Sequence, residues 1–363
     1  MSKFIIACGG TGGHLVPGIA IGQALIEAGH EVSFAISKKQ VDSRLVEKYT
    51  NLQFIKMSGA PFSLNPIKFL RFAKEFLLSI TKSMKLLLCE KYDAVISFGG
   101  FNSLGISLAA ALLGKPIILH EANRKTGKAT RLLGYFARRV YVPFGVEIPR
   151  RKINQVKFAG YPLRKEIKRI DKILAKEFFG FNANSNILLI LGGSQGAKVL
   201  NDWACENFEQ LAEKGIDVLC VCGQNKNDIK ERKIQTANAG ERILKSLDFC
   251  DNMASALSAA EIVVARAGAG TIAELARCSV PSIMVPYPFA ADNHQLENAK
   301  CFEKQGACAV VEQKDISKLF NEVVALFENQ KMRETMQRNL ERVDEQNDCS
   351  RIVEDIAQIA KGQ

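Results

Sequence analysis

The sequence has few of the residues that build metal sites or membrane spans. It has four histidines in 363 residues, and its ten cysteines form no C-x-x-C pair, so a zinc site is not expected. No apolar run approaches the roughly 20 residues that a membrane-spanning helix needs. The segment Met1–Cys8 carries one lysine before a short apolar run, which is typical of a first strand rather than a signal peptide. We therefore expect reduced thiols and a cytoplasmic protein.

Acidic residues are the minority among the charged ones. The 38 Asp and Glu face 49 Lys and Arg, which gives a net charge of +11. With 47% hydrophobic residues the chain is globular in composition, which excludes disordered and collagen-like classes. A basic surface favours an anionic partner, which is a phosphorylated substrate, acidic lipid headgroups or nucleic acid. Composition does not choose among these partners.

A strand–turn–helix–strand pattern opens the chain. The apolar run Lys3–Cys8 enters the glycine turn Gly9–His14, a helix is predicted over Leu15–Ala28, and Glu31–Ile36 has the pattern of the next strand. Such a unit is typical of a parallel sheet with covering helices.

The same pattern restarts in the second half. Asn186–Leu191 enters Gly192–Gly196, a helix begins at Ala197, and Asp217–Val221 has the pattern of a strand. We therefore predict an α/β protein with two Rossmann-like domains, whose parallel sheets face a cleft. Further predicted strands are Ala94–Ser97, Ile117–His120, Val140–Pro143, Ile262–Ala265 and Ser282–Val285, and a helix is predicted over Ser103–Leu113.

Domain boundaries follow from this repeat. We predict an N-terminal domain over residues 1–162 and a C-terminal domain over 163–345, with Gly160–Arg164 as the hinge. Residues from about 346 to 363 form a final helix with one apolar face, and that face must pack on something.

Both glycine turns are candidate anion sites, because backbone N–H groups at a helix start can approach a phosphate. The alternative is a tight turn without a ligand. The dinucleotide pattern G-x-G-x-x-G fails at Leu15, which disfavours an NAD enzyme. The P-loop pattern fails at Ala197 and Lys198, which disfavours a P-loop kinase. A D-x-D metal-diphosphate motif is absent too.

A second group of small residues precedes a predicted helix in the C-terminal half. Gly268, Ala269, Gly270 and Thr271 leave a strand and form a further candidate diphosphate seat. Glu274 follows one turn later and would accept hydrogen bonds from ribose hydroxyls. Its alternative is a carboxylate favoured near a helix start. The polar run at Asp292–Gln295 also follows a strand, where open α/β sheets bind ligands.

Together these motifs resemble one family, the MurG-type glycosyltransferases. Such enzymes transfer N-acetylglucosamine from UDP-GlcNAc to undecaprenyl-pyrophosphoryl-MurNAc-pentapeptide, which turns lipid I into lipid II. The resemblance runs from Ile5 to at least Gln295 and implies a GT-B fold. It is carried in order by GGTGGHLVP at 9–17, SFGGF at 97–101, HEAN at 120–123, GYPLR at 160–164, GGSQGA at 192–197, RAGAGTIAE at 266–274 and DNHQ at 292–295.

The resemblance also implies functional residues. The N-terminal domain would hold the lipid acceptor, and the C-terminal domain the UDP-sugar without a metal or other cofactor. The final helix, from about 346 to 363, would cross back and pack on the N-terminal domain. Glu274 matches the ribose-binding carboxylate and Cys250 a backbone contact to the uracil. Tyr161 and Ala122 depart from the Asn and Gln that members often carry. These departures bear on the local hydrogen bonds expected there and not on the family resemblance. The other matched donor contacts are Thr11, Gly12, Gly13, Asn123, Arg164, Ser194, Gln195 and Gln295.

An inverting transfer needs a base for the acceptor 4-hydroxyl. His14 is the first candidate, because a neutral imidazole can take a proton near pH 7. Alternatively, His14 hydrogen-bonds a phosphate or caps the helix. Glu121 is the second candidate, and its alternative role is to orient the acceptor.

A membrane-bound acceptor requires a docking surface, and Pro66–Lys91 is the best candidate segment. As a helix it would have one stripe of phenylalanine and aliphatic residues that serves the core. The opposite arc is basic and would meet anionic headgroups on the cytoplasmic face of the plasma membrane. The alternative is an ordinary amphipathic helix with solvated lysines. The docking residues we predict are Ile67, Lys68, Arg71, Lys74, Leu78, Lys82 and Lys85.

Other functions stay open at this point. Another UDP-sugar transferase would share the donor half, a UDP-GlcNAc 2-epimerase would share the fold, and a nucleotide-sugar binding protein would lack catalysis. Under the family resemblance nucleic acid is not a partner, and other cell-wall synthesis proteins are.

Overall fold

The computed structural model separates the chain into two compact units. The N-terminal unit is Met1–Arg164 together with Gln346–Gln363, and the C-terminal unit is Lys165–Glu345. The boundary after Arg164 lies two residues beyond the one that the sequence predicts. The structure describes residues 1–9, 12–37, 46–57, 66–100, 103–146, 148, 155–193, 196–223 and 229–362, and for 66–71 it describes the backbone only.

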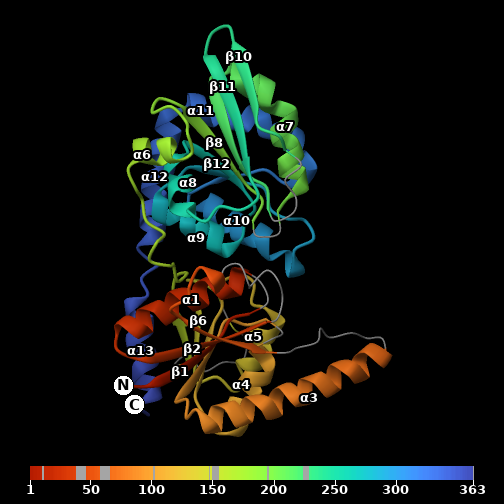
Figure 1. Ribbon diagram of the computed structural model, residues 1–363, viewed down its shortest axis with the longest axis vertical. Coiled ribbons are helices and arrows are strands. Elements are labelled where there is room, and N and C mark those ends of the chain that lie inside the picture. The colour runs from red at the N-terminus through yellow and green to blue at the C-terminus, as the bar shows by residue number, and fades with distance from the viewer. Residues whose placement is uncertain are drawn as a thin grey trace. The chain divides into compact units, whose positions relative to one another are not determined.

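The N-terminal unit is a parallel sheet covered by helices (Figure 1). The sheet has seven strands in the order β3-β2-β1-β4-β5-β6-β7, and every pair is parallel. Strand β3 lacks a strong apolar pattern and is not among the predicted strands. The elements are β1 (Lys3–Ala7), α1 (Gly12–Glu27), β2 (Glu31–Ser37), β3 (Gln53–Met57), α3 (Pro66–Cys89), β4 (Ala94–Ser97), α4 (Ser103–Leu112), β5 (Ile117–His120), α5 (Lys128–Leu133), β6 (Arg139–Val142), β7 (Val156–Phe158) and α13 (Ser350–Ala360).

Alternation along β1 builds a core on each face of this sheet. Phe4 and Ile6 pack on one face with α1 and α13. Ile5 and Ala7 pack on the other face with α3 and α4. A strand that is covered on both faces is apolar on both, as β1 is from Phe4 to Ala7.

The last helix, α13, closes the N-terminal unit. Its apolar face enters the core with Ile352, Val353, Ile356 and Ile359, and each such buried side chain contributes roughly 1.5–3 kcal/mol. Asp355 adds a polar clasp. Burial alone would raise the pKa of its carboxyl group, but the net shift is downward because Lys157 and Tyr141 hydrogen-bond to it and Arg139 lies beside it. The clasp therefore strengthens when Asp355 is ionised.

The C-terminal unit repeats this plan with one antiparallel pair. Its sheet has seven strands in the order β10-β11-β9-β8-β12-β13-β14, all parallel except β10 with β11. The hairpin is a difference from the wholly parallel sheet that we predicted. The elements are α6 (Lys172–Phe178), β8 (Asn186–Leu191), α7 (Lys198–Glu213), β9 (Ile216–Val221), β10 (Arg232–Thr236), β11 (Gly240–Leu247), α8 (Met253–Ala259), β12 (Ile262–Ala265), α9 (Ala269–Cys278), β13 (Ser282–Met284), the 3-10 turns Ala291–Asn293 and Gln313–Lys318, α10 (His294–Lys304), β14 (Ala309–Val310), α11 (Leu319–Glu328) and α12 (Gln330–Asp344).

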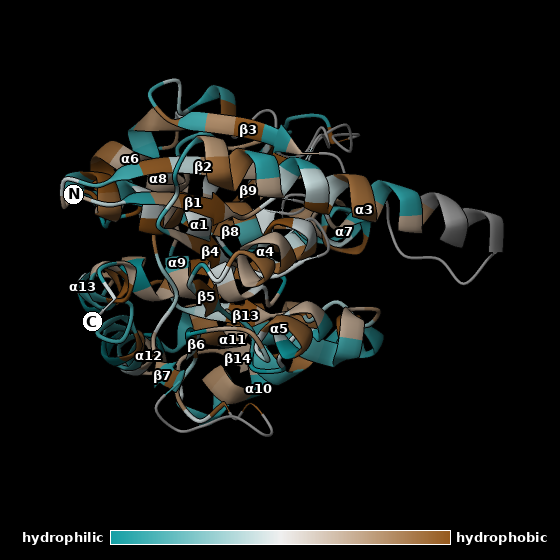
Figure 2. Cartoon of the chain, turned by 90° about the horizontal axis from the view of Figure 1, so that it is seen from below, coloured by the Kyte–Doolittle hydropathy of each residue, from teal (hydrophilic) through white to brown (hydrophobic). Residues whose placement is uncertain are grey.

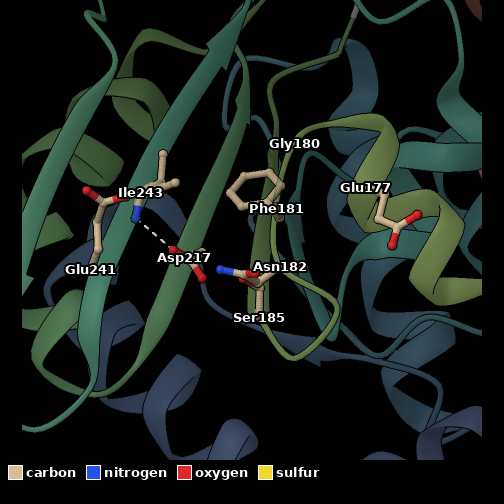
Figure 3. A pocket seen from close by; sticks show the side chains of 8 residues that line it. All are labelled: Glu177, Gly180, Phe181, Asn182, Ser185, Asp217, Glu241 and Ile243. Atoms are coloured by element: carbon tan, nitrogen blue, oxygen red, sulfur yellow. Dashed lines mark hydrogen bonds between the residues drawn. The ribbon is translucent and has the colours of Figure 1, made fainter.

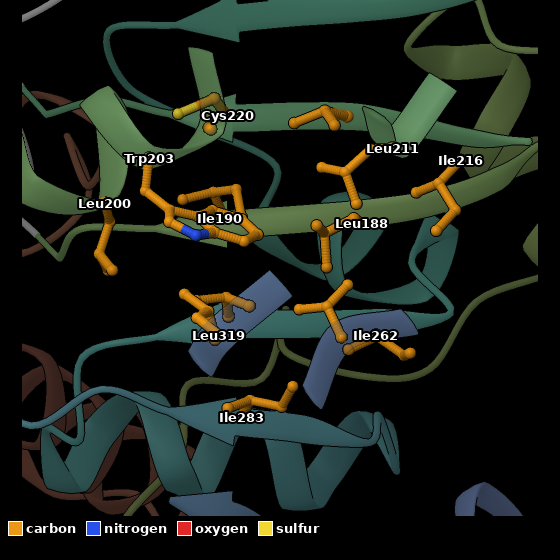
Figure 4. Packing of buried hydrophobic residues seen from close by; sticks show 14 of the residues in the cluster. Leu188, Ile190, Leu200, Trp203, Leu211, Ile216, Cys220, Ile262, Ile283 and Leu319 are labelled. Carbon is orange, nitrogen blue, oxygen red and sulfur yellow. The ribbon is translucent and has the colours of Figure 1, made fainter. Parts of the chain in front are cut away.

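The core of the C-terminal unit lies between its sheet and two helices (Figure 4). Leu188 and Ile190 of β8 pack against Trp203 of α7 and Leu319 of α11. A rigid sheet of this kind leaves its function to the loops at the carboxyl ends of the strands.

Candidate active site

The loops after β1 and β4 bring His14 against a glycine turn in the N-terminal unit. Helix α1 begins at Gly12, three residues earlier than the Leu15 that the sequence predicts, so His14 stands in its first turn. A Cβ added to Gly100 would lie 3.0 Å from Cε1 of His14 and 3.1 Å from its Nδ1. Gly100 also has φ of +79°, a conformation that favours glycine. The imidazole therefore lies directly beside this turn.

Glu121 directly follows β5, and its carboxylate accepts hydrogen bonds from the loop that comes after it. Its Oε1 accepts hydrogen bonds from the backbone N–H and the side-chain amide of Asn123, at 3.1 and 3.2 Å. Its Oε2 accepts one from the Gly127 N–H at 2.8 Å, and the side chain is buried. These bonds favour an orienting role for Glu121, and Asn123 belongs to the same loop.

Arg164 ends the N-terminal unit as a buried side chain. Its Nη1 donates to the Tyr49 hydroxyl at 3.2 Å. This predicted donor contact belongs to the N-terminal unit.

The C-terminal unit presents backbone donors at the corresponding edge of its sheet. After β8 the turn contains Gly193 and Gly196 with φ of +78° and +68°. After β12, Gly268 is the N-cap of α9, and Ala269, Gly270 and Thr271 form its first turn. The first N–H groups of a helix have no carbonyl partner within it, so this turn suits an anion. Glu274 lies half-buried one turn further along α9.

Arg266 connects the segments that follow three strands at this edge of the sheet. Its Nη1 donates to the carbonyls of Val285 and Pro286, at 3.0 and 3.2 Å, and its Nη2 to Gln313 at 2.6 Å. Burial lowers the pKa of the guanidinium, which the three carbonyl acceptors hold in place. Sequence reasoning quoted Arg266 only as part of a motif, since its partners are 19 to 47 residues away.

The loop between β13 and α10 completes the edge. Gln295 Oε1 accepts a hydrogen bond from the Tyr287 N–H at 2.9 Å. Asn298 of α10 donates to the Ala267 carbonyl at 3.2 Å, just before α9. Helix α10, which begins with His294 and Gln295, thus contacts the residue before α9 through Asn298.

Comparison with known proteins identifies the family. The model of the glycosyltransferase family 28 N-terminal domain matches residues 4–142, and that of the C-terminal domain matches residues 187–354. The UDP-N-acetylglucosamine–N-acetylmuramyl-(pentapeptide) pyrophosphoryl-undecaprenol N-acetylglucosamine transferase of Opitutus terrae is 42% identical over 99% of this chain and 96% of its own length. The enzyme of that name from Francisella tularensis is 31% identical over 98% of this chain and 97% of its own.

The chain belongs to glycosyltransferase family 28. Among solved structures, MurG of Acinetobacter baumannii has a TM-score of 0.70 with 24% identity and covers 100% of this chain and 99% of its own. The Streptomyces glycosyltransferase SsfS6, solved with thymidine diphosphate, has a TM-score of 0.66 with 14% identity over 99% of this chain and 100% of its own. These likenesses support the GT-B fold that the motifs implied.

Several predicted site residues of this family 28 chain remain without a described position. Thr11, Ser194 and Gln195 lie outside the described residues. Gly12 and Gly13 begin α1, and Cys250 is a buried residue of the loop between β11 and α8.

None of the ten cysteines, all of them described, forms a disulfide. Within the described ranges no group of three or more His, Cys, Asp or Glu could hold a metal ion.

Helix α3 has two unlike faces. Phe76, Ile80, Met84 and Leu87 pack on the core of the N-terminal unit. The outer face exposes Lys74, Lys82 and Lys85 together with Leu77, Leu78 and Leu88, and hydrophobic and hydrophilic segments alternate along the helix in Figure 2. The side chains of the predicted docking residues Ile67, Lys68 and Arg71 lie outside the description. Among the described residues no helix is both long and apolar enough to cross a membrane.

A pocket of about 370 Å³ in the C-terminal unit lies away from these loops (Figure 3). It is lined by Ser185 just before β8, Asp217 near the start of β9, and Glu177 and Glu241. The Asp217 carboxylate is engaged by the Ile243 N–H at 2.7 Å and by Arg242 at 3.1 Å. The pocket thus opens at the amino ends of the parallel strands, opposite the edge where such sheets bind ligands.

Proposed function

We propose that this chain transfers N-acetylglucosamine from UDP-GlcNAc to the MurNAc 4-hydroxyl of undecaprenyl-pyrophosphoryl-MurNAc-pentapeptide, which converts lipid I to lipid II in peptidoglycan synthesis. The observation that carries the proposal is the 42% identity to the Opitutus terrae transferase over 99% of the chain. Because the identity extends over both units, both would take part in the reaction that the relative is named for.

In this proposal the acceptor uses the N-terminal unit. The acceptor 4-hydroxyl attacks the anomeric carbon of the sugar, and the bond from that carbon to the diphosphate oxygen breaks with inversion. The hydroxyl proton passes to the His14 imidazole, which is half-buried beside Gly100 and can be neutral near pH 7. Glu121 keeps the neighbouring loop in shape through its three hydrogen bonds.

The departing UDP uses the C-terminal unit. Backbone N–H groups at the start of α9 and in the turn after β8 would stabilise the diphosphate charge as the bond breaks. Glu274 would accept hydrogen bonds from the ribose hydroxyls, and Gln295 and Cys250 would make further contacts to the donor. Arg266 supports this set indirectly, because its donors hold the carbonyls of Val285 and Pro286.

The acceptor is a membrane lipid, so we propose peripheral docking on the cytoplasmic face of the plasma membrane. The outer face of α3 carries exposed lysines interleaved with exposed leucines. Lysines attract anionic headgroups and leucines enter the boundary region. Other cell-wall synthesis proteins would then meet the enzyme at that surface.

An assay with purified protein, radiolabelled UDP-GlcNAc and vesicles with or without lipid I tests the function. Label in lipid II only when lipid I is present is the expected result. Conversion of UDP-GlcNAc to its 2-epimer without acceptor would identify an epimerase instead. Binding of UDP-GlcNAc without either product would leave a nucleotide-sugar binding protein.

A further inference from the structure

His120 is the last residue of β5, and its side chain contacts a part of the chain that is distant in sequence. The side chain is 3% exposed, and its Nε2 lies 3.1 Å from the carbonyl oxygen of Gly160. The ring packs beside Phe98 at 5.4 Å and Tyr141 at 6.5 Å between ring centroids. The Nδ1 atom is buried and has no hydrogen-bond partner.

The partner of His120, Gly160, stands where the chain leaves and re-enters the N-terminal unit. The Gly160 N–H donates to the Gln346 carbonyl at 3.0 Å, and a Cβ at this position would lie 2.1 Å from the same oxygen. The next residue, Tyr161, donates its N–H to Asn347 Oδ1 at 2.8 Å. The chain leaves the N-terminal unit after Arg164 and returns to it at Gln346. These two segments, the chain crossings, are therefore hydrogen-bonded to each other at Gly160 and Tyr161.

His120 also adjoins the loops of the proposed acceptor side, one through the next residue in the sequence and one through a ring contact. Glu121 follows it directly and holds the loop to Gly127. Phe98, which packs on the His120 ring, leads into the Gly99–Gly100 turn that lies against His14. The imidazole thus stands between the fastened crossings and the groups proposed to handle the acceptor.

The chemistry of the ring suits a fixed donor. Burial lowers the pKa of His120 to about 4, so the ring is neutral at pH 7 with one N–H. The Gly160 carbonyl can only accept, so the proton belongs on Nε2. An unpartnered buried Nδ1 costs stability, and a phenylalanine would fill the same space without that cost. Packing alone therefore does not account for a histidine here.

We propose that His120 is a positioning residue for the transfer: its Nε2–H holds the Gly160 carbonyl, and with it both chain crossings, in register with the loops that carry His14 and Glu121. This inference rests on the proposed function. His120 itself touches no reacting atom in it.

Three variants test the role. His120→Phe keeps the ring packing and removes the donor, whereas His120→Gln places an amide N–H near the position of Nε2. His30→Phe is the matched control, because His30 also packs on a phenylalanine, Phe4, at 5.3 Å, and accepts a backbone hydrogen bond from Ser2 at 3.1 Å at the other end of the sheet. Turnover of lipid I, the dissociation constant for UDP-GlcNAc and the melting temperature are measured for each.

We expect His120→Phe to lower kcat about tenfold or more while the UDP-GlcNAc dissociation constant stays within about twofold. His120→Gln should restore kcat to within about threefold of the wild type, and His30→Phe should leave kcat unchanged. Wild-type kcat in folded His120→Phe, or a folded His120→Gln as impaired as His120→Phe, would overturn the role.

If His120→Phe does not fold, the pair His120→Gln and His120→Asn decides. The shorter Asn amide reaches only the position of Nδ1, so it should fail where Gln succeeds, and equal turnover of the two would refute the inference. A wild-type protein that makes no lipid II would instead refute the proposed function.

Discussion

The two sheets have closely similar strand orders, yet their carboxyl edges are built from different chemical groups. In the N-terminal unit the edge adds titratable side chains to its glycine turn, with His14 beside Gly100 and Glu121 held by three hydrogen bonds. In the C-terminal unit it is made of backbone amides at the start of α9 and in the turn after β8. A proton acceptor must be a side chain of suitable pKa, whereas a diphosphate is held well by backbone N–H groups. The comparison thus fits the proposed reaction, in which one edge takes the proton and the other stabilises the leaving group.

Replacing the His14 imidazole should have the largest effect on turnover. We expect His14→Ala to lower turnover roughly a hundredfold or more, because the acceptor hydroxyl loses its base. UDP-GlcNAc binding, measured by calorimetry, should stay close to wild type, since the backbone donors at the start of α9 and the Glu274 carboxylate lie in the other unit.

Glu121→Gln is the matched comparison for His14→Ala. The amide can still accept at one oxygen but cannot take both backbone N–H bonds, so a moderate loss is expected. A larger loss than that of His14→Ala would make Glu121 the base. Loss of donor binding in His14→Ala would make His14 a phosphate ligand.

Charge reversal on the outer face of α3 should have the next largest effect. Lys74→Glu, Lys82→Glu and Lys85→Glu together should weaken sedimentation with vesicles of anionic lipid by up to about a hundredfold, since each lysine near such a surface contributes about 1 kcal/mol. The effect should shrink as salt is raised. Figure 1 shows α3 extending past the sheet of its unit, and the three lysines are exposed.

A matched triple variant on the C-terminal unit controls for net charge. Lys198, Lys233 and Lys314 are also exposed and, changed to Glu, should leave vesicle binding intact. Equal losses in both triples would mean that total charge, not the α3 face, drives binding.

How far the sequence predicts these edges depends on how local each feature is. Strands β4, β5, β8 and β12 have the predicted bounds, because a short apolar run between turn residues specifies a buried strand locally. Strand β3 and the β10–β11 hairpin are polar enough to escape that pattern, and only their pairing in the sheet establishes them.

Contacts across the chain are where sequence reasoning stops. The glycines at 99 and 100 are visible in the sequence, but their contact with His14 depends on β1 and β4 being neighbours. Likewise Arg266, after β12, and Gln313, after β14, meet only because β13 pairs with both strands. The family motifs nonetheless marked most of these positions, since a motif records a three-dimensional requirement without stating its geometry.

The donor edge is probed by Glu274→Ala, with a smaller expected effect. Ribose hydroxyls would lose a charged acceptor worth about 1.5–3 kcal/mol, so UDP-GlcNAc affinity should fall roughly ten- to a hundredfold. Glu274→Gln should recover part of the loss. Wild-type affinity in Glu274→Ala would show that the ribose assignment is wrong.

The smallest expected effect concerns the stability of the N-terminal edge as pH falls. Burial lowers the folded-state pKa of His120 to about 4, below the ordinary value near 6.5. The unfolded chain therefore binds this proton first, and the contribution of the neutral ring is complete above pH 6.5 and declines towards pH 4. From pH 6.5 to 5 the wild type should lose about 1.5 kcal/mol more unfolding free energy than His120→Phe. The pKa of His30 is also lowered, first by burial, so His30→Phe should remove a smaller part, and Asp355 acts only near and below pH 4. Urea unfolding followed by far-UV circular dichroism at pH 6.5 and pH 5 measures this difference for the wild type and for both variants. Equal losses in the wild type and in His120→Phe would show that His120 is not the origin of the pH dependence.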